Sequence, residues 1–123
     1  MLDDISIKEK LRIVQELVPG KQISIAHIIA NPDEVLYKKL GLDPAVEYSK
    51  TAIGIVTMSP AETAIIAGDI AIKSSGVELG FVDRFSGTLI VTGTVSDVMV
   101  SLTSLVDYCE NTLGFTVCPI TKT

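Results

Sequence analysis

Residues 51–58 (TAIGIVTM) place the strongest constraint on how this chain can fold. Their apolar side chains occupy both alternating sets of positions, and Lys50 and Ser59-Pro60 bound the run. Because successive side chains of a strand point to opposite faces of a sheet, a strand of this kind needs cover on both faces. The run therefore predicts a buried strand inside a layered fold.

A helix is predicted directly after this strand. Ser59-Pro60-Ala61-Glu62 has the pattern of a capping box with proline at the first helical position, and the helix is expected to run to about Ser75. It contains the small residues Ala61, Ala64, Ala67, Gly68 and Ala71. Small side chains let a helix come close to its neighbour, so we expect tight packing against the sheet or against another subunit.

Three further strands are predicted from β-rich runs that turn residues bound. They cover residues 21–30, 77–82 and 88–95. In the first of them Ile23 and Ile25 alternate against Ser24, as in a half-buried strand. Residues 83–87, which link the other two, include a glycine and have the length of a hairpin connection.

Two further helices have recognisable ends. Asn31 is the expected N-cap of the first helix, which ends at Gly41. Ser96 is the expected N-cap of the second, with Asp97 in its first turn and Gly114 at its end. The buried stripe of this second helix is predicted to consist of Val98, Leu102, Leu105, Val106, Cys109 and Leu113.

The predicted order from residue 21 is therefore β-α-β-α-β-β-α-β, with residues 116–120 as a last strand or an extended tail. This order is typical of the α+β class, as a ferredoxin-like split βαβ sandwich with helices on one side of a mainly antiparallel sheet. We expect a single domain at residues 21–123 after an N-terminal extension at residues 1–20. Within the extension, residues 12–18 fit either a helix or a short strand.

The composition limits the partners. Hydrophobic residues make up 47% of the chain, which is more than the core of one small domain needs, so part of the surface is expected to be covered by other subunits. The net charge of −5 argues against a nucleic-acid partner. Residues 85–96 form the longest uncharged run, well short of the roughly 20 residues of a membrane span. The N-terminus is acidic and lacks a signal peptide, which predicts a cytoplasmic protein.

Chemical motifs are scarce. The only histidine, His27, lies in an apolar strand and is expected to be a hydrogen-bonded sheet residue. Cys109 and Cys118 lack CxxC spacing and predict free thiols, and no phosphate-binding glycine loop is present. We therefore expect no enzyme activity, no metal and no cofactor. Asp69 and Lys73 form an i,i+4 pair, which is either a surface ion pair or leaves Lys73 to contact a neighbouring molecule.

Several strings resemble a known family. They are VPGKQ (18–22), IAHIIANP (25–32), KKLG (38–41), AIGI (52–55), GFVDRFSG (80–87) and CPIT (118–121). Together they resemble circularly permuted bacterial microcompartment shell proteins of the propanediol-utilisation U type and the ethanolamine-utilisation S type. The resemblance covers nearly the whole chain and implies a circularly permuted BMC-domain sandwich.

The resemblance also implies a function. It implies a structural protein without catalysis, a homohexamer that tiles edge to edge with other shell proteins around a propanediol, ethanolamine or choline pathway. A lumen enzyme or its targeting peptide is a further implied partner. The alternative from the fold alone is a ferredoxin-like module that binds a small molecule and acts in regulation. Such a module would respond to small ligands, whereas the shell protein would form hexamers.

Three sets of site residues are carried over from the resemblance. The loop around the central opening matches Asp83, Arg84, Phe85, Ser86 and Gly87. The hexamer edge matches Lys73, and Asn31 occupies the region where unpermuted relatives carry an arginine. A strand of a six-stranded parallel β-barrel over the opening matches Arg12, Ile13, Val14, Gln15, Glu16, Leu17 and Val18.

Overall fold

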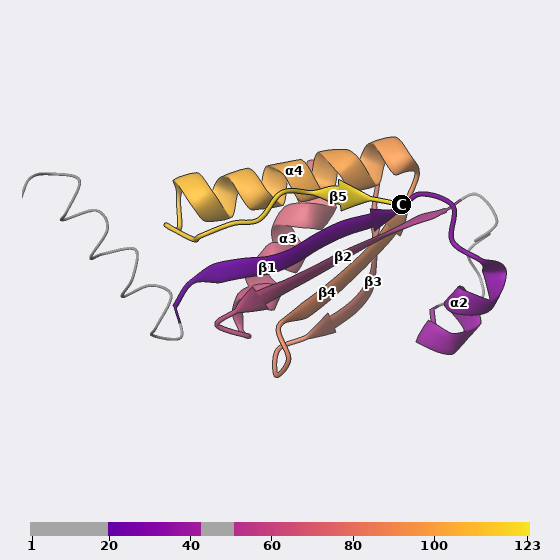
Figure 1. Cartoon of the computed structure of the whole chain (residues 1–123), viewed down its shortest axis with the longest axis horizontal. Helices are drawn as coiled ribbons and strands as arrows, with labels where there is room; N and C mark the ends of the chain where they lie inside the picture. Colours follow the sequence, from indigo (N-terminus) through magenta and orange to yellow (C-terminus); the bar gives the residue numbers. More distant parts are fainter. Residues whose placement is uncertain (1–19, 43–50) are drawn as a thin grey trace, which may run out of the picture.

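The computed structural model describes residues 20–42 and 51–123 (Figure 1). Their elements, in chain order, are β1 (Gln22–Ile29), α2 (Glu34–Leu40), β2 (Ala52–Ser59), α3 (Thr63–Ser74), β3 (Glu78–Asp83), β4 (Thr88–Gly93), α4 (Val95–Asn111) and β5 (Thr121–Lys122). The predicted order of strands and helices is confirmed. The last strand comes later than expected, because residues 116–120 contribute only a bridge between Gln22 and Thr116.

The strands form one mixed sheet in the order β3-β4-β2-β1-β5. β2 lies in the interior and pairs antiparallel with β1 and β4, so that Ile55 lies opposite both His27 and Ile90. β4 also pairs antiparallel with β3, whereas β5 runs parallel to β1. β2, α3 and β3 therefore form a split βαβ unit with β4 between its strands. The buried interior position of residues 51–58 and the α+β class are both confirmed.

Helices α3 and α4 cover one face of the sheet, and the main core lies between these two helices and the sheet (Figure 1). The small residues of α3 allow the expected close approach to the sheet. A side-chain carbon at Gly68 would lie 3.3 Å from the Val82 side chain. The predicted stripe of α4 is buried, except that Leu113 is only partly buried and lies beyond the helix end.

Helix α2 corrects the expectation that all helices lie on one side of the sheet. Its buried Tyr37 packs with Ile53 and Ile90 in a second, smaller core. Gly54, the neighbour of Ile53 in β2, faces α4, so Ile53 belongs to the opposite face. The Tyr37 hydroxyl donates a hydrogen bond to the carbonyl oxygen of Thr51, which fixes α2 beside the start of β2.

The N-caps of α2 and α4 differ from the predicted ones. Asp33, not Asn31, caps α2 and accepts a hydrogen bond from the amide two residues later. Thr94, not Ser96, caps α4 and accepts a hydrogen bond from the Asp97 amide at 3.1 Å. Each stretch offers two candidate polar residues, and only the residue with extended backbone just before the first turn can act as the cap.

The expected capping box of α3 is absent. Ser59 is the last residue of β2, and Glu62 makes no side-chain capping bond. The first amides of the helix are instead satisfied by the backbone. Thr63 N donates to Pro60 O at 3.0 Å, and Ala64 N donates to Ala61 O at 3.1 Å. Such i,i+3 turns satisfy the free amides of a helix start without a side chain.

A bulge in β1 corrects the predicted alternation of Ile23 and Ile25. The pairing with β2 is shifted between these two residues, around Ser24. Since one extra residue reverses the facing of every later side chain, Ile25 is exposed while Ala26 and Ile28 are buried.

His27 is a hydrogen-bonded sheet residue, as predicted. Its Nδ1 lies 2.6 Å from Thr121 Oγ1 and its Nε2 lies 2.9 Å from Thr123 Oγ1. These contacts hold the chain end against β1.

Cys109 and Cys118 are both free thiols, and burial raises the pKa of Cys109.

Candidate functional site

The loop between β3 and β4 is built around the carboxylate of Asp83. Asp83 Oδ1 accepts a hydrogen bond from the Phe85 amide at 2.9 Å, and Oδ2 accepts one from the Ser86 hydroxyl at 2.8 Å. The same Ser86 oxygen lies 3.0 Å from Thr88 Oγ1. These bonds lower the pKa of Asp83, the Phe85 amide most and the Ser86 hydroxyl next. The arrangement is therefore stable at neutral pH and weakens only as the pH falls through this lowered pKa.

Gly87 closes the loop and ties it to the neighbouring strand. Its amide donates to Asp83 O at 2.9 Å, and its carbonyl oxygen accepts from Met58 N at 2.9 Å. Its φ of 75° lies in the left-handed region, and a side chain would overlap the Met58 carbonyl oxygen. Only glycine fits this position without strain.

The tip of the loop presents a cation and an aromatic ring to solvent. Phe85 is 80% exposed, and the Arg84 guanidinium carbon lies 5.0 Å from the centre of its ring. The Asp83 carboxylate already accepts bonds within the loop, so Arg84 carries the outward-facing charge. The five predicted loop residues thus lie together in one hydrogen-bonded turn.

The two predicted edge residues lie on different elements. Lys73 is in the last turn of α3, its side chain is 74% exposed, and its Nζ lies 2.8 Å from Asp69 Oδ2. The expected surface ion pair is present. Asn31 is exposed in the connection between β1 and α2. In the described part of the chain, the two residues share no hydrogen bond or ion pair.

The seven candidate barrel residues, 12–18, lie outside the described residues. Within residues 20–42 and 51–123, no group of three or more histidine, cysteine or acidic side chains could hold a metal ion. In the same part of the chain, no helix has the length and apolar character to cross a bilayer.

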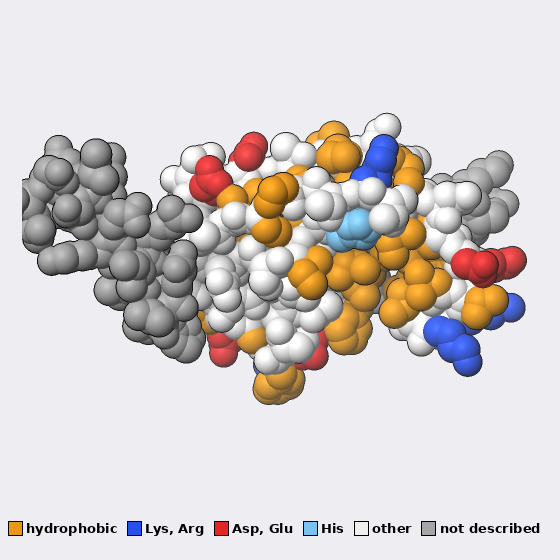
Figure 2. Space-filling view, in the orientation of Figure 1, with side chains coloured by type: hydrophobic (Ala, Val, Ile, Leu, Met, Phe, Trp, Pro, Cys, Tyr) orange, Lys and Arg blue, Asp and Glu red, His pale blue; other side chains and the backbone are white. Residues whose placement is uncertain are grey.

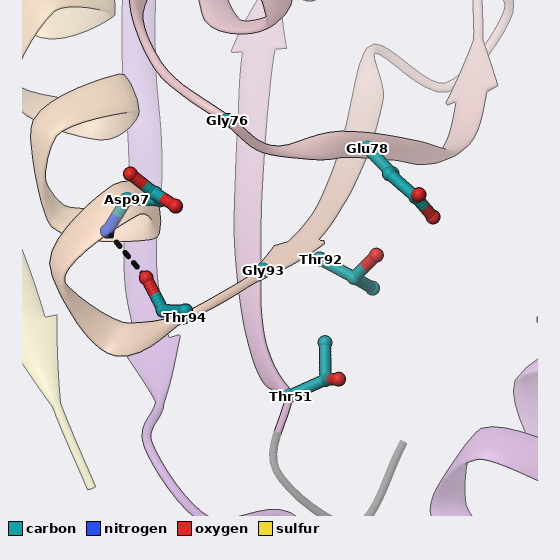
Figure 3. A pocket seen from close by; sticks show the side chains of 7 residues that line it. All are labelled: Thr51, Gly76, Glu78, Thr92, Gly93, Thr94 and Asp97. Carbon is teal, nitrogen blue, oxygen red and sulfur yellow. Dashed lines mark hydrogen bonds between the residues drawn. The ribbon is translucent and has the colours of Figure 1, made fainter. Parts of the chain in front are cut away.

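Sequence reasoning did not find a pocket at the far end of the sheet. It is lined mainly by Thr51, Gly76, Glu78, Thr92, Thr94 and Asp97 (Figure 3). These residues come from the starts of β2, β3 and α4 and from the end of β4. Residues 92–97 are neighbours in the sequence, but only the strand order brings them beside Thr51 and residues 76–78.

The fold and the loop define the class of protein. A family model described as the BMC domain matches residues 52–121, which is more than half of the chain. The chain belongs to the BMC-domain family, as the resemblance implied. Proteins of this family that form microcompartment shells are structural and not enzymes, which confirms the absence of catalysis expected from the sequence.

Within the family, the relatives specify the type. The chain is 50% identical over 113 residues to the bacterial microcompartment shell protein EutS of Salmonella typhimurium, covering 92% of this chain and 97% of EutS. It is 51% identical over 112 residues to the shell protein PduU of the same organism, covering 91% and 93%. A solved flat hexamer of CutR superposes with a TM-score of 0.79 at 45% identity, covering 86% and 94%. The chain is a microcompartment shell protein of the type to which EutS, PduU and CutR belong.

Proposed function

We propose that this chain forms a hexameric tile of the shell around a propanediol, ethanolamine or choline pathway. The observation that carries the proposal is the placement of the loop and of Lys73 at opposite ends of β3. Lys73 precedes the start of this strand and residues 83–87 follow its end, and a strand of 6 residues spans about 20 Å. In a cyclic assembly, one end can face the centre while the other faces the rim.

Exposed apolar side chains support burial between subunits. Large hydrophobic residues remain exposed on the single chain, among them Ile25, Ile65, Ile66, Leu79, Phe81 and Phe85. On the face drawn in Figure 2, many hydrophobic side chains lie in the right half of the view, around the histidine, and one group projects at the tip of the β3–β4 loop. Exposed apolar surface of this extent is typical of protein interfaces. Neighbouring subunits of the tile are its proposed cover, and other shell proteins are the proposed partners at the rim.

The proposed tile is circularly permuted and carries a barrel over its centre. The family match starts at the beginning of β2, so β1 and α2 precede the matched segment. This order supports a permutation that moves a strand and a short helix to the front of the domain. Arg12 to Val18 would supply one barrel strand per subunit. The barrel would restrict passage through the opening and offer a docking point for a lumen enzyme or its targeting peptide.

The mass in solution tests the hexamer. Six copies of 13.1 kDa give about 79 kDa, which light scattering measures directly. Negative-stain images of the same sample should show six-fold rings, with density over the centre where the barrel lies. A monomer, dimer or trimer would contradict the tile, and rings with an open centre would contradict the barrel alone.

Replacing Lys73 by alanine should weaken the association of tiles. We expect hexamers of unchanged mass and fewer extended sheets in electron micrographs. Because the exposed pair with Asp69 contributes at most about 1 kcal/mol, the unfolding temperature should change by only a few degrees. Lys39→Ala is the matched control, since Lys39 is an exposed lysine in the last turn of α2. Sheets as abundant as those of the control would argue against the edge role.

A further inference from the structure

The chain that follows α4 lies along the outer edge of the sheet. Figure 1 shows it running beside β1, on the side of β1 that β2 does not cover. Thr116 lies opposite Gln22, and Thr121 lies opposite His27, the same number of residues further along both segments. The two pairings therefore belong to one parallel strand that is interrupted in its middle. Residues 117–123, which follow the first pairing, are called the strap below.

The first half of the strap is held weakly. In the described part of the chain, residues 117–120 pair with no strand, and Pro119 among them has no amide hydrogen to donate. β1 is irregular over the same stretch, because its bulge lies around Ser24. Three apolar side chains of this half are only partly buried against the main core, namely Val117, Cys118 and Ile120.

The chain just before the strap is anchored firmly. The Thr116 amide donates a hydrogen bond to Lys21 O at 3.0 Å, and Thr116 O accepts one from the Ile23 amide at 2.9 Å. Phe115 is only 6% exposed, belongs to the main core, and donates from its amide to Cys109 O at 2.8 Å. A strap that leaves β1 would therefore turn about Thr116 and keep Phe115 in place.

The far end of the strap is fastened to β1 by its backbone and by His27. The Thr123 amide donates to Ile28 O, and Thr123 O accepts from the Ala30 amide, both at 2.9 Å. The two ring nitrogens of His27 face the hydroxyls of Thr121 and Thr123, at 2.6 and 2.9 Å. A neutral imidazole has one donor and one acceptor, and a hydroxyl can act as either, so both bonds form in either tautomer. One side chain thus holds two residues of the strap.

We propose that the strap detaches from β1 as a unit while the rest of the fold stays intact, and that His27 is the latch that keeps it closed. β5 has only two residues, and residues 121–123 are exposed. An element with so few buried contacts opens at a lower free energy than the core. Opening frees the outer edge of β1, and an unpaired edge of this kind can accept another strand. The strap is therefore a movable guard of this edge.

The two cysteines report on the strap in the unmodified protein. Cys118 lies in the strap, whereas Cys109 is fully buried on α4. Iodoacetamide reacts with a thiol once the thiol is uncovered, so the two rates separate opening of the strap from opening of the core. Each rate is divided by that of the same cysteine in urea. We expect Cys118 to be alkylated at least tenfold faster than Cys109, measured by mass spectrometry. Equal rates would mean that the strap opens only with the whole fold, which contradicts the proposal.

His27→Leu tests the latch, because leucine bonds neither threonine hydroxyl. The loss of two hydrogen bonds should raise the alkylation rate of Cys118 about tenfold. Cys109 should accelerate by the same factor, since the variant weakens the closed state from which both openings start. His27→Gln keeps a donor and an acceptor and should restore part of the loss. An unchanged Cys118 rate in His27→Leu would refute the role of His27.

Thr123→Val removes a single bond of the latch and checks the result by a second route. Valine has nearly the same shape as threonine, so the strap should keep its path, and the Cys118 rate should rise about threefold. In a His27→Leu background, Thr123→Val should have no further effect, because its partner is already absent. A full additional rise in that background would show that the hydroxyl acts without His27, and the latch would be rejected.

Val82→Ala is the matched control for local opening. Val82 lies in β3, at the opposite edge of the sheet from the strap, and its side chain is beside Gly68 of α3. Its truncation weakens the closed state and the strap-open state equally. Alkylation of Cys109 should therefore become faster while that of Cys118 stays unchanged. Equal acceleration of the two cysteines in Val82→Ala would show a single global opening and would overturn the detachable strap.

Discussion

Replacing Gly87 by alanine should lower the free energy of unfolding by about 3 kcal/mol or more. The φ of 75° alone costs a residue with a side chain about 1–2 kcal/mol. The added carbon would also overlap the Met58 carbonyl oxygen. This oxygen belongs to the backbone of an interior strand and cannot move aside without loss of sheet pairing. The loop around Asp83 should be distorted at the same time, because the Gly87 amide bonds to it.

Gly114→Ala separates the two causes of this loss. Gly114 has a φ of 73°, but in the described part of the chain nothing lies within 4 Å of the added carbon. This control should therefore lose only about 1 kcal/mol. Thermal unfolding of both variants at one protein concentration should show a gap of roughly 6 °C or more. Equal shifts would mean that the β2–loop contact relaxes freely and that the loop is not rigid.

The order of the elements was predictable because each boundary has a local chemical signal. Glycine residues such as Gly41 end helices where a left-handed residue is needed. The run at residues 51–58 is apolar on both faces and can only be an interior strand. The helix caps were less predictable. Asn31 and Asp33 are both good caps, and the choice between them depends on where the backbone first becomes helical.

The candidate site was predictable only where its residues are adjacent in sequence. The loop at residues 83–87 forms one turn because Asp83, Ser86 and Gly87 are local partners. The pocket was not predictable, since its residues belong to three stretches of the chain, at 51, 76–78 and 92–97, that meet through the order β3-β4-β2. The position of α2 was missed for a similar reason, because it depends on the contact of Tyr37 with the second face of the sheet.

Leu102→Ala should lower the free energy of unfolding by about 3 kcal/mol, as expected for a fully buried leucine. Leu102 packs over Gly54, where α4 crosses the middle of β2. A side-chain carbon at Gly54 would lie 3.0 Å from Leu102 Cδ1 and 2.8 Å from Val98 Cγ1. Gly54→Ala alone should therefore also destabilise the protein, by about 1–3 kcal/mol through overpacking.

The two substitutions should compensate each other in part. In the double variant, the methyl group at position 54 would occupy some of the cavity left by Leu102, so the combined loss should fall short of the sum by about 1 kcal/mol. Gly54→Ala with Leu105→Ala is the control, since Leu105 is equally buried on α4 but is not among the three side chains nearest to Gly54. Denaturant unfolding at fixed protein concentration measures all of these losses. Simple additivity in both pairs would show that α4 shifts on the sheet to accommodate each change, and that Gly54 does not set the distance between helix and strand.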